Sequence, residues 1–379
     1  MFKLIAKDRD ARTGELHVNG KVIKTPFFMP VATKGSVKYM NSKLLQQAGI
    51  QCIISNSLIF NWNPGLDIVK NAGGLHKFIN WQGGVFTDSG GFQSLDDNML
   101  LGTTHEAAIF KSPFDGIVYE ISPEKAMEIQ YTLGSDVAMC LDEVPLHDDS
   151  WRTVRSKTLR TNSWARRCKQ YHDEIDNNKK QLLFGIAQGG NYPDMRKKSI
   201  EFLSKLGFDG IAQGGLAIGE PVEKMYKTLS ETCSIMPEKT IRYLMGVGNP
   251  VDILESVSYG VDCFDSTFPT QNARHGTLFT FDGKLRITNS EHKNDLGPIE
   301  KGCDCFTCKN YSKAFVRHLL KNKEGVGLEL ATIHNITFMR RLMEEIRNSI
   351  KEKRFFEFKK RMSSLYEGER FINLSGFSS

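Results

Sequence analysis

Eight short β-rich segments recur along residues 27–269, and stretches with apolar residues at helical spacing separate them. Several segments are continuous apolar runs, which is typical of parallel strands buried on both faces. Intervening stretches such as PEKAMEIQYTLG and PVDILESVSYG open with Pro, as many helices do. Eight βα units predict a (β/α)8 barrel, with a doubly wound open sheet as the second choice. The expected strands span residues 27–32, 52–57, 84–89, 137–143, 183–190, 209–215, 243–248 and 262–269.

The segments that flank these units have a different rhythm. Residues 1–24 predict a β-hairpin or small sheet, with turns at residues 12–14 (Arg-Thr-Gly) and 19–20 (Asn-Gly). Residues 150–180 predict one long polar helix. From residue 281 a polar stretch, a cysteine cluster and a run of helices follow without a low-complexity linker, so we expect a docked subdomain. The expected units are the barrel with its hairpin (1–280), the cysteine-containing subdomain (281–345) and a C-terminal helical segment that packs on the barrel (346–379).

Composition limits the class of protein only broadly. The chain has 379 residues, of which 40% are hydrophobic, and a formal charge of +6. This length suits one barrel of roughly 250 residues plus additions. The modest basic excess allows a polyanionic partner, and ordinary surface lysines explain it equally well.

Cysteine usage and hydropathy indicate the compartment. Five of the eight cysteines are scattered, mostly in apolar surroundings, which indicates a reduced compartment rather than a disulfide framework. The N-terminal residues contain no apolar stretch of signal-peptide length. No run approaches the roughly 20 apolar residues of a membrane span. We therefore expect a cytoplasmic protein without a membrane segment.

Polar and acidic residues gather where six of the expected strands end. A carboxylate in such a place can simply cap the next helix. A barrel, however, assembles its catalytic site at this end, and six coincident cases favour a site over six unrelated caps. These residues are Asn56, Asp88, Asp142, Gln188, Gly214, Gly215 and Asp265.

Two of these carboxylates, Asp88 and Asp265, most constrain the chemistry. Two carboxylates that face one sugar suit the exchange of a glycosidic bond: one attacks the anomeric carbon, and the other moves protons. The Gly-Gly pairs after Ser89, after Gln188 and at residues 214–215 would let a planar base approach the backbone and would offer N–H donors. Tight βα turns use the same glycines, so each pair alone is weak support.

A cysteine cluster predicts a metal centre. Cys303, Cys305 and Cys308 form a C-x-C-x2-C pattern. His334, which follows a helix expected over residues 309–321 and a loop, is the expected fourth ligand, with His292 and His318 as alternatives. Three thiolates and one imidazole make a closed tetrahedral zinc site, which is typical of a structural metal. Residues 281–345 are therefore expected to form a zinc-binding subdomain that holds one zinc ion per chain.

Basic and aromatic side chains surround this cluster. A basic zinc subdomain beside an active site suits a phosphate backbone. Helices with polar outer faces and aromatic inner faces explain the same residues. The basic residues are Arg274, Lys301, Lys309, Lys313, Arg317, Lys321, Arg340, Arg341, Arg347, Lys351, Lys353 and Arg354.

The order of the motifs resembles that of the tRNA-guanine transglycosylases. The motifs are FTDSGGFQ, LDE, FGIAQGG, GGLAIGE, YLMGVG, FDSTFPTQNARHG and CDCFTC with a later HN. The resemblance runs from MPVATKGSVK to the final helix. It implies a (β/α)8 barrel with an inserted zinc subdomain that exchanges a guanine in tRNA for a 7-deazaguanine base, in queuosine biosynthesis. It also implies a homodimer.

The resemblance assigns a role to each site residue. It implies that Asp265 is the nucleophile that forms a covalent aspartyl-ribose intermediate, and that Asp88 is the general base for the incoming base. Asp142, Gln188 and the Gly215 N–H resemble the groups that read the guanine-like edge. Asn56 would support Asp88 or the ribose, and Phe92 and Met245 would sandwich the ring. The remaining members of the expected substrate-binding set are Ser89, Gly214, Leu216 and Ile218.

Departures from the family pattern lie around base and tRNA recognition. Ile218 is bulky where queuine-using members tend to have Gly, which favours 7-aminomethyl-7-deazaguanine, with queuine next. Gln271 replaces a usual arginine, while Arg274 remains, and these two are the expected tRNA-binding residues. Val144 and Ala187 also depart from the pattern. The anticodon wobble position is the expected site of exchange, and the change at Gln271 leaves this requirement open.

Three other functions compete with this interpretation. The chain could be a non-catalytic accessory subunit that binds tRNA, although the intact aspartates weigh against this. It could be a related exchanger that uses 7-cyano-7-deazaguanine or acts on another nucleic acid. A glycoside hydrolase could use the same barrel.

Overall fold

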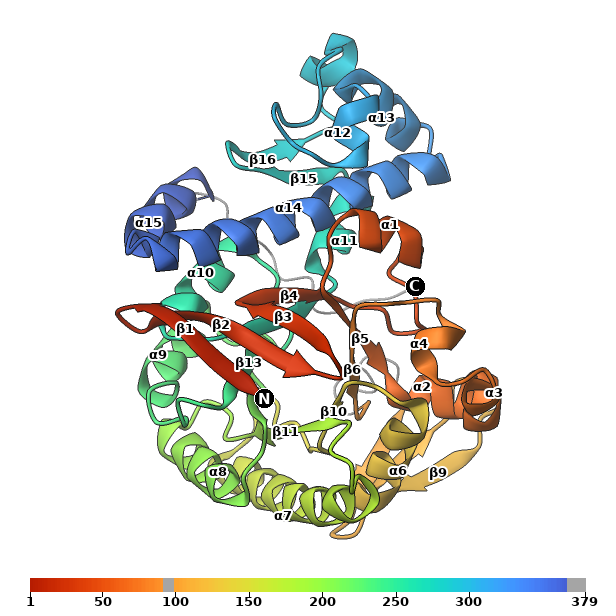
Figure 1. Ribbon diagram of the computed structural model, residues 1–379, viewed down its shortest axis with the longest axis vertical. Helices are drawn as coiled ribbons and strands as arrows, with labels where there is room; N and C mark the ends of the chain where they lie inside the picture. The colour runs from red at the N-terminus through yellow and green to blue at the C-terminus, as the bar shows by residue number, and fades with distance from the viewer. Residues whose placement is uncertain (91–98, 367–379) are drawn as a thin grey trace.

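The computed structural model describes residues 1–90 and 99–366, and eight parallel strands form its centre. Helices surround these strands on the outside (Figure 1). Each strand corresponds to one of the expected segments, so the predicted barrel is confirmed and the doubly wound sheet is not formed. The strands are β4 (Phe27–Pro30), β5 (Cys52–Asn56), β6 (Gly84–Asp88), β10 (Val137–Met139), β11 (Leu182–Ala187), β12 (Gly210–Gln213), β13 (Ile241–Leu244) and β14 (Cys263–Ser266).

The strand order shows how the sheet curls into a barrel. Hydrogen-bonded neighbours run in the order β4-β14-β13-β12-β11-β10-β6-β5. The first and last strands approach each other at a parallel bridge between Val31 and Ile54, where the Ala32 N–H donates to the Ile54 carbonyl at 2.7 Å. The barrel is therefore nearly closed, and the carboxyl ends of all eight strands face the same mouth.

Large aromatic side chains fill the barrel interior. Phe86 makes an edge contact with Phe184 at a centroid distance of 5.4 Å and lies 6.0 Å from Phe27. All three rings are almost completely buried. Such a packed interior leaves the catalytic groups to the strand ends and their loops, as in other barrels of this type.

Helices on the outside of the barrel begin at recognisable caps. Ser122 and Ser150 each accept a hydrogen bond from the backbone N–H three residues later, at the start of α6 (Pro123–Leu133) and α7 (Trp151–Ile175). The expected long polar helix is thus α7. The other helices of this layer are α1 (Ser42–Gln47), α2 (Ser57–Phe60), the π-helical turn η1 (Asn61–Gly65), α3 (Leu66–Asn71), α4 (Leu75–Phe78), α8 (Pro193–Leu206), α9 (Val222–Thr232) and α10 (Pro250–Ser258).

A small antiparallel sheet precedes the barrel, as expected, but its first turn differs from the prediction. The strands are β1 (Phe2–Asp8), β2 (Ala11–Val18) and β3 (Lys21–Thr25). The first turn lies at residues 9–10, and the Arg-Thr-Gly segment predicted as a turn is part of β2. Arg12 is buried there and forms an ion pair with Asp262, which immediately precedes β14. This long-range ion pair holds Arg12 within β2. The residue types of the Arg-Thr-Gly segment give no sign of it.

A second antiparallel sheet was not expected from the sequence. It consists of β7 (Leu100–Thr103), β8 (Ala108–Lys111) and β9 (Val118–Ile121). The Thr103 hydroxyl donates a 2.7 Å hydrogen bond to Glu143, which also forms an ion pair with Arg160 of α7. This connection ties the small sheet to the loop that follows β10.

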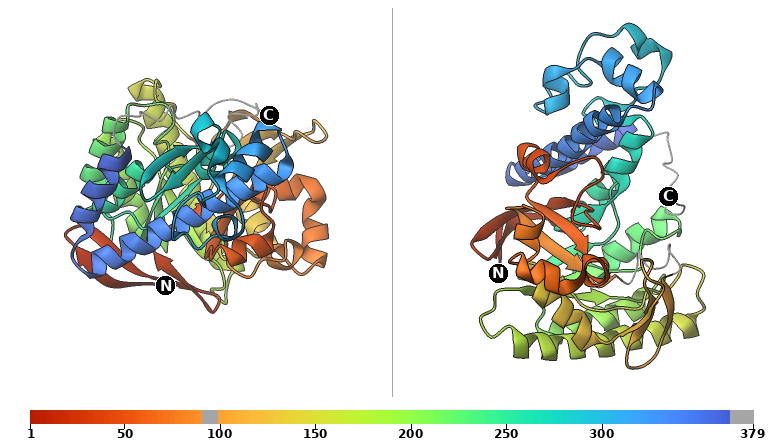
Figure 2. Two further views of the ribbon diagram at one scale, coloured as in Figure 1. Left: turned by 90° about the horizontal axis from the view of Figure 1, so that it is seen from above. Right: turned by 90° about the vertical axis from the view of Figure 1, so that its right-hand side faces the viewer.

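The C-terminal part stands beyond the barrel and contains the cysteine cluster (Figure 2). Its helix α14 also packs against β1, β2 and β4, and α15 packs against α10 and α14. One helix was expected over 309–321, but two helices form, because Ser312 caps a new one at residue 313. The elements are α11 (Phe268–Arg274), β15 (Thr277–Thr280), β16 (Gly283–Arg286), the 3-10 turn η2 (Ser290–Asn294), α12 (Phe306–Asn310), α13 (Lys313–Lys321), α14 (Gly325–Lys351) and α15 (Phe355–Tyr366).

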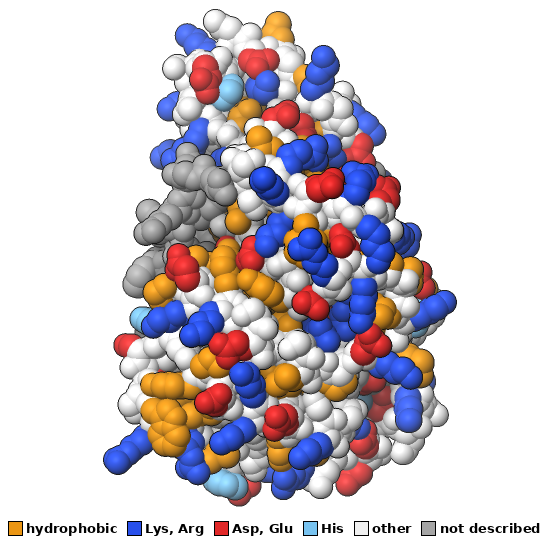
Figure 3. Space-filling view, turned by 90° about the vertical axis from the view of Figure 1, so that its left-hand side faces the viewer, with side chains coloured by type: hydrophobic (Ala, Val, Ile, Leu, Met, Phe, Trp, Pro, Cys, Tyr) orange, Lys and Arg blue, Asp and Glu red, His pale blue; other side chains and the backbone are white. Residues whose placement is uncertain are grey.

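The distribution of surface charge and the composition of the helices can be compared with the expectations from sequence. Basic and acidic side chains interleave over the face shown in Figure 3. Within residues 1–90 and 99–366, no helix combines the length and apolar character that crossing a bilayer requires.

Candidate active site and metal centre

Asp265 lies at the end of β14, and two donors hold one of its carboxylate oxygens. The Tyr243 hydroxyl donates to Oδ1 at 2.6 Å, and the Gly246 backbone N–H donates to the same oxygen at 2.9 Å. Both donors come from β13 and the turn after it, because β13 and β14 are paired neighbours. Burial raises the pKa of Asp265, and these two hydrogen bonds act in the opposite direction. The second oxygen, Oδ2, is the one that these donors do not hold.

Asp88 lies at the end of β6, and its surroundings favour the protonated form. Burial, opposed by a 2.9 Å hydrogen bond from the Gly90 N–H, raises the pKa of Asp88 to about 7. The negative charges of Asp265 and Asp142 contribute smaller parts of the same rise. The three carboxylates are thus electrostatic neighbours at one barrel mouth. A carboxyl group with a pKa near neutrality can both donate and accept a proton at pH 7.

Asp142 and Gln188 form a second polar pair at the same mouth. The Gln188 side-chain amide donates to Asp142 at 2.7 Å, and burial raises the pKa of Asp142 to about 6. A Cβ atom built on Gly214 or Gly215 would lie 2.5 or 2.6 Å from this amide, so a larger residue at either position would displace it. Gly215 also has a φ of +66°, which glycine adopts without strain. The polar pair and the glycine backbone therefore pack against each other in one cluster.

Two residues that sequence reasoning missed hold the backbone in and beside this cluster. Arg196 of α8 is buried and donates to the carbonyl oxygens of Ala187 and Gly214 at 2.9 Å and of Gly190 at 3.2 Å. Glu220 accepts the backbone N–H groups of Ala217 and Ile218. Arg196 lies within a helix and gives no local signal that it will reach back to strand ends, so tertiary structure was needed to find its contacts. Glu220 lies in the loop before α9, and its contacts are local.

The remaining predicted substrate residues lie next to this core of the site. Asn56 pairs in register with Asp88 and caps α2 by accepting the Ile59 N–H at 2.9 Å. Ser89 and Leu216 are buried, and Ile218 and Met245 are half-buried. Met245 directly precedes Gly246, the donor to Asp265. Phe92 lies outside the described residues.

The two expected tRNA-binding residues share one helix. Gln271 and Arg274 lie on α11, which begins two residues after the end of β14. Both are half-buried. The strand that carries Asp265 therefore leads directly into the helix that carries these two side chains.

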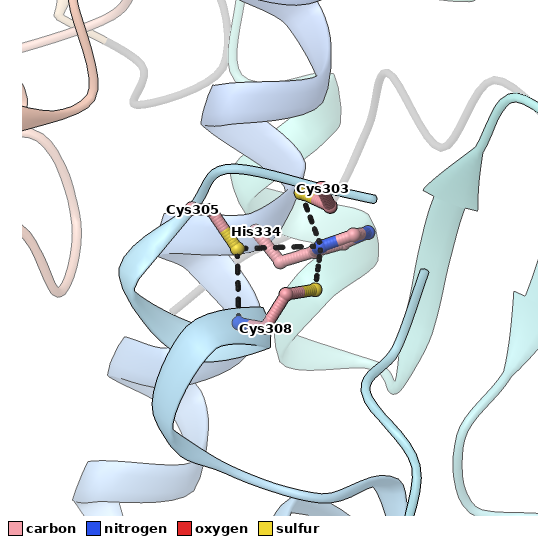
Figure 4. Close-up of side chains that lie close together, drawn as sticks. All are labelled: Cys303, Cys305, Cys308 and His334. Atoms are coloured by element: carbon pink, nitrogen blue, oxygen red, sulfur yellow. Dashed lines mark hydrogen bonds between the residues drawn. The ribbon is translucent and has the colours of Figure 1, made fainter. Parts of the chain in front are cut away.

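The cysteine cluster forms a four-ligand group with His334 (Figure 4). His334 Nδ1 lies 3.9, 3.7 and 3.4 Å from the sulfurs of Cys303, Cys305 and Cys308. All four ligand atoms lie within 4.8 Å of one another. His334 is thus the histidine of this group, rather than His292 or His318. As expected, it follows a helix, α13, and a short loop, and the structure places it inside the next helix, α14.

The donor set fits a tetrahedral zinc ion. Ligand bonds of 2.0–2.3 Å at tetrahedral angles place S and N atoms about 3.6 Å apart, which matches the observed spacing. The other ring nitrogen, His334 Nε2, lies 2.8 Å from the Phe279 carbonyl oxygen. A hydrogen bond to this carbonyl keeps the proton on Nε2 and leaves Nδ1 free to bind metal. The geometry supports a metal ion, and four protein ligands leave no open position for catalysis.

Comparisons with known proteins agree with the motif order. The family model described as queuine tRNA-ribosyltransferase matches residues 8–368. The queuine tRNA-ribosyltransferase of Thermodesulfovibrio yellowstonii is 46% identical over 360 residues, which cover 95% of this chain and 93% of that protein. The protein of the same name from Blochmanniella pennsylvanica is 43% identical over 357 residues, covering 94% of this chain and 96% of that protein. The chain therefore belongs to the queuine tRNA-ribosyltransferase family, a family of pentosyltransferases also called tRNA-guanine transglycosylases.

Proposed function

We propose that this protein is an active transglycosylase that replaces a guanine in tRNA with a 7-deazaguanine base through a covalent aspartyl-ribose intermediate. The observation that carries the proposal is the electrostatic neighbourhood of Asp88, Asp142 and Asp265 at one barrel mouth. The names of the relatives support the same reaction and its place in queuosine biosynthesis.

Asp265 is the proposed nucleophile. One carboxylate oxygen forms a bond to C1′ of the ribose while the bond from C1′ to N9 of guanine breaks, and the electron pair stays with the guanine. The Tyr243 and Gly246 hydrogen bonds to Oδ1 orient the carboxylate and leave Oδ2 for attack. They also favour the ionised form that a nucleophile needs.

Asp88 is the proposed proton-transfer group for both half-reactions. Its protonated form gives a proton to N9 of the departing guanine, and its ionised form then removes the N9 proton of the incoming base. That base attacks C1′, and the bond from C1′ to Asp265 breaks, so the aspartate is regenerated. A pKa of about 7 makes both forms of Asp88 accessible at neutral pH. Two inversions at C1′ retain the β-configuration.

Asp142, Gln188 and Gly215 are the proposed groups that read the base. A guanine-like edge carries N–H donors beside one carbonyl oxygen. Asp142 accepts from the donors, and the Gly215 N–H donates to the carbonyl oxygen. The buried Oε1 atom of Gln188 has no hydrogen-bond partner among the described residues, so a donor from the base would remove the cost of leaving it unpaired. Phe92 and Met245 are proposed to sandwich the ring.

The size of the incoming base is proposed to depend on the side chain of Ile218. Glu220 binds the N–H of this branched residue, which is half-buried. A branched side chain at this position narrows the space for a base with a large substituent. We therefore favour 7-aminomethyl-7-deazaguanine over queuine. The wobble guanine of the anticodon is the proposed target, and Gln271 and Arg274 of α11 are the proposed contacts to tRNA.

The metal centre has a proposed structural role. Cys303, Cys305, Cys308 and His334 would hold one zinc ion per chain, which links the α12 region to α14. Residues 281–345 are proposed to form the zinc-binding unit between the barrel (1–280) and the C-terminal segment (346–379). A homodimer that acts in the cytoplasm completes the proposal.

Labelled-guanine exchange into tRNA tests this function. The purified zinc-replete protein is incubated with bulk tRNA and labelled guanine, with 7-aminomethyl-7-deazaguanine, queuine and 7-cyano-7-deazaguanine as separate competitors. We expect incorporation into tRNA, no incorporation into DNA, and strongest competition by 7-aminomethyl-7-deazaguanine. Absence of exchange in both nucleic acids would contradict the proposal. Exchange only in DNA would favour the alternative that the protein is a base exchanger acting on DNA.

A further inference from the structure

A polar pocket lies away from the three carboxylates, at the N-terminal ends of β4 and β5. Its volume is 390 Å³, within the range of small-molecule sites. One wall is the C-terminal half of α14, and the other includes Lys24, Phe27 and Gln51. Phe27 begins β4 and Gln51 precedes β5, whereas the carboxylates lie at or beyond the opposite ends of their strands. The pocket is therefore separate from the proposed base and ribose sites.

The backbone around the pocket is fixed by side-chain hydrogen bonds. The Gln51 side chain accepts the Lys24 N–H at 2.8 Å and donates to the Lys24 carbonyl oxygen at 3.2 Å. Arg347 Nη1 donates to the Pro26 carbonyl oxygen at 2.7 Å. The segment at residues 24–26 is therefore held from two sides, and the pocket is a built feature rather than a gap between mobile loops.

Arg347 is the unusual residue of this pocket. Only 8% of the residue is exposed, so the guanidinium is largely withdrawn from water. Burial lowers the pKa of Arg347 to about 10, which still leaves the group charged at pH 7. Glu344 is the carboxylate that interacts electrostatically with Arg347, but it already forms a 2.6 Å ion pair with Arg340. A buried cation whose hydrogen bond goes to a neutral carbonyl oxygen lacks the counter-charge that burial normally requires.

The remaining charged side chains that line the pocket also leave more positive than negative charge. Arg340 is compensated by Glu344 and by Asp304 at 2.6 Å. Lys24, Lys351 and Glu345 line the pocket as exposed side chains, and none of them forms an ion pair within the described part of the chain. Arg347 and these two lysines against Glu345 leave an excess of positive charge that faces the pocket.

We propose that this pocket binds a small phosphorylated anion. Arg347 would supply the guanidinium N–H groups that match phosphate oxygens, and Lys24 and Lys351 would supply ammonium groups at the rim. Phosphate fits better than a long polyanion, because the pocket is limited in volume and Glu345 lies at its edge. The site is independent of the proposed transglycosylase reaction.

Titration calorimetry with inorganic phosphate and pyrophosphate tests this site on the full-length, zinc-replete protein. The test variant is Lys24→Gln with Lys351→Gln, since both residues are exposed and their loss does not disturb the core. A matched control, Lys198→Gln with Lys205→Gln, removes the same charge from two exposed lysines of α8. We expect one saturable site per chain, with pyrophosphate the tighter ligand, and affinity weaker by about tenfold or more in the test variant alone.

Two results would overturn the proposal. One is the absence of saturable binding of either anion at millimolar concentration. The other is equal weakening in the test and control variants, which would show a general charge effect. Arg347→Lys gives a second readout, because a point charge in place of the planar fork should weaken binding while the lysine pair stays intact.

Discussion

Tyr243 and Asp265 lie on neighbouring barrel strands, and the Tyr243 hydroxyl donates a 2.6 Å hydrogen bond to Asp265 Oδ1. Tyr243 is almost completely buried, and its own pKa is raised by burial and by the Asp265 charge. The hydroxyl therefore stays protonated and remains a donor over the whole physiological pH range. This contact links the packed barrel interior to the proposed nucleophile.

Tyr243→Phe should reduce the rate of exchange without preventing folding. Loss of a hydrogen bond to a charged group costs about 1.5–3 kcal/mol, which corresponds to a decrease in kcat of roughly tenfold to a hundredfold. Because the hydroxyl holds the pKa of Asp265 down, the acidic limb of the pH profile should move to higher pH. Tyr226→Phe removes a similar 2.6 Å bond to Asp252 outside the site and serves as the control. An unchanged kcat and pH profile in Tyr243→Phe would contradict this role.

Asp88→Asn should abolish exchange and stabilise the fold. Because the folded-state pKa of Asp88 is about 7 and its unfolded value is near 3.8, the unfolded chain releases the proton first as pH rises. Asp88 therefore lowers stability progressively between about pH 4 and pH 7, and the loss is complete above pH 7. A neutral amide avoids this cost, and we expect a gain of about 2 kcal/mol at pH 8, because Asp88 is partly exposed and solvent reduces the full effect. Chemical denaturation at pH 8 and pH 5 measures it, and the gain should shrink at pH 5. A loss of stability at pH 8 would contradict the assigned surroundings.

Asp142→Asn should weaken recognition of the base more than it weakens binding of tRNA. A missing charged acceptor leaves the base N–H groups poorly paired, which should raise the KM for the free base about a hundredfold. In the unmodified protein kcat/KM for the base should fall below pH 6, because the pKa of Asp142 is about 6 and its protonated form accepts poorly. Asp148→Asn, an exposed carboxylate in the same loop, is the control. Equal effects of the two variants would argue against base reading by Asp142.

Removal of metal should destabilise the C-terminal part first. Elemental analysis should give one zinc per chain, and Cys308→Ala should lose it. Because ligand binding and local folding are coupled, we expect a loss of several kcal/mol of stability, on the order seen for structural zinc sites. The exposed neighbour Lys309→Gln should keep both zinc and stability. A metal-free protein with unchanged stability under chelation would refute the structural role.

The barrel could be predicted because each of its strands carries its own local signal. A continuous apolar run such as that at residues 137–141 is followed directly by a polar residue, here Asp142, and such endings also mark the site. The cysteine spacing located three of the four metal-binding residues in the same way. Local patterns were sufficient wherever one short segment determines both the strand and the residue at its end.

Other features depend on partners far away in the chain. Arg12 belongs to a strand because Asp262, 250 residues later, neutralises it in a buried position. Arg196 binds the carbonyl oxygens of Ala187 and Gly214 from a helix, and the strands β7 to β9 are too short to show alternation. The sequence placed His334 after a helix and a loop, but apolar periodicity did not mark where the 27-residue helix α14 that contains it begins. Neither local secondary-structure propensity nor residue spacing shows which distant residues will be in contact.

Trapping the covalent intermediate tests the central claim most directly. The protein is mixed with tRNA in the absence of free base, denatured and digested, and the RNA-linked peptide is identified by mass spectrometry. The proposed mechanism predicts an adduct on Asp265 that disappears in Asp265→Asn and that is released when 7-aminomethyl-7-deazaguanine is added before denaturation. An adduct on another residue, or an adduct that persists in Asp265→Asn, would contradict the assignment of Asp265 as the nucleophile.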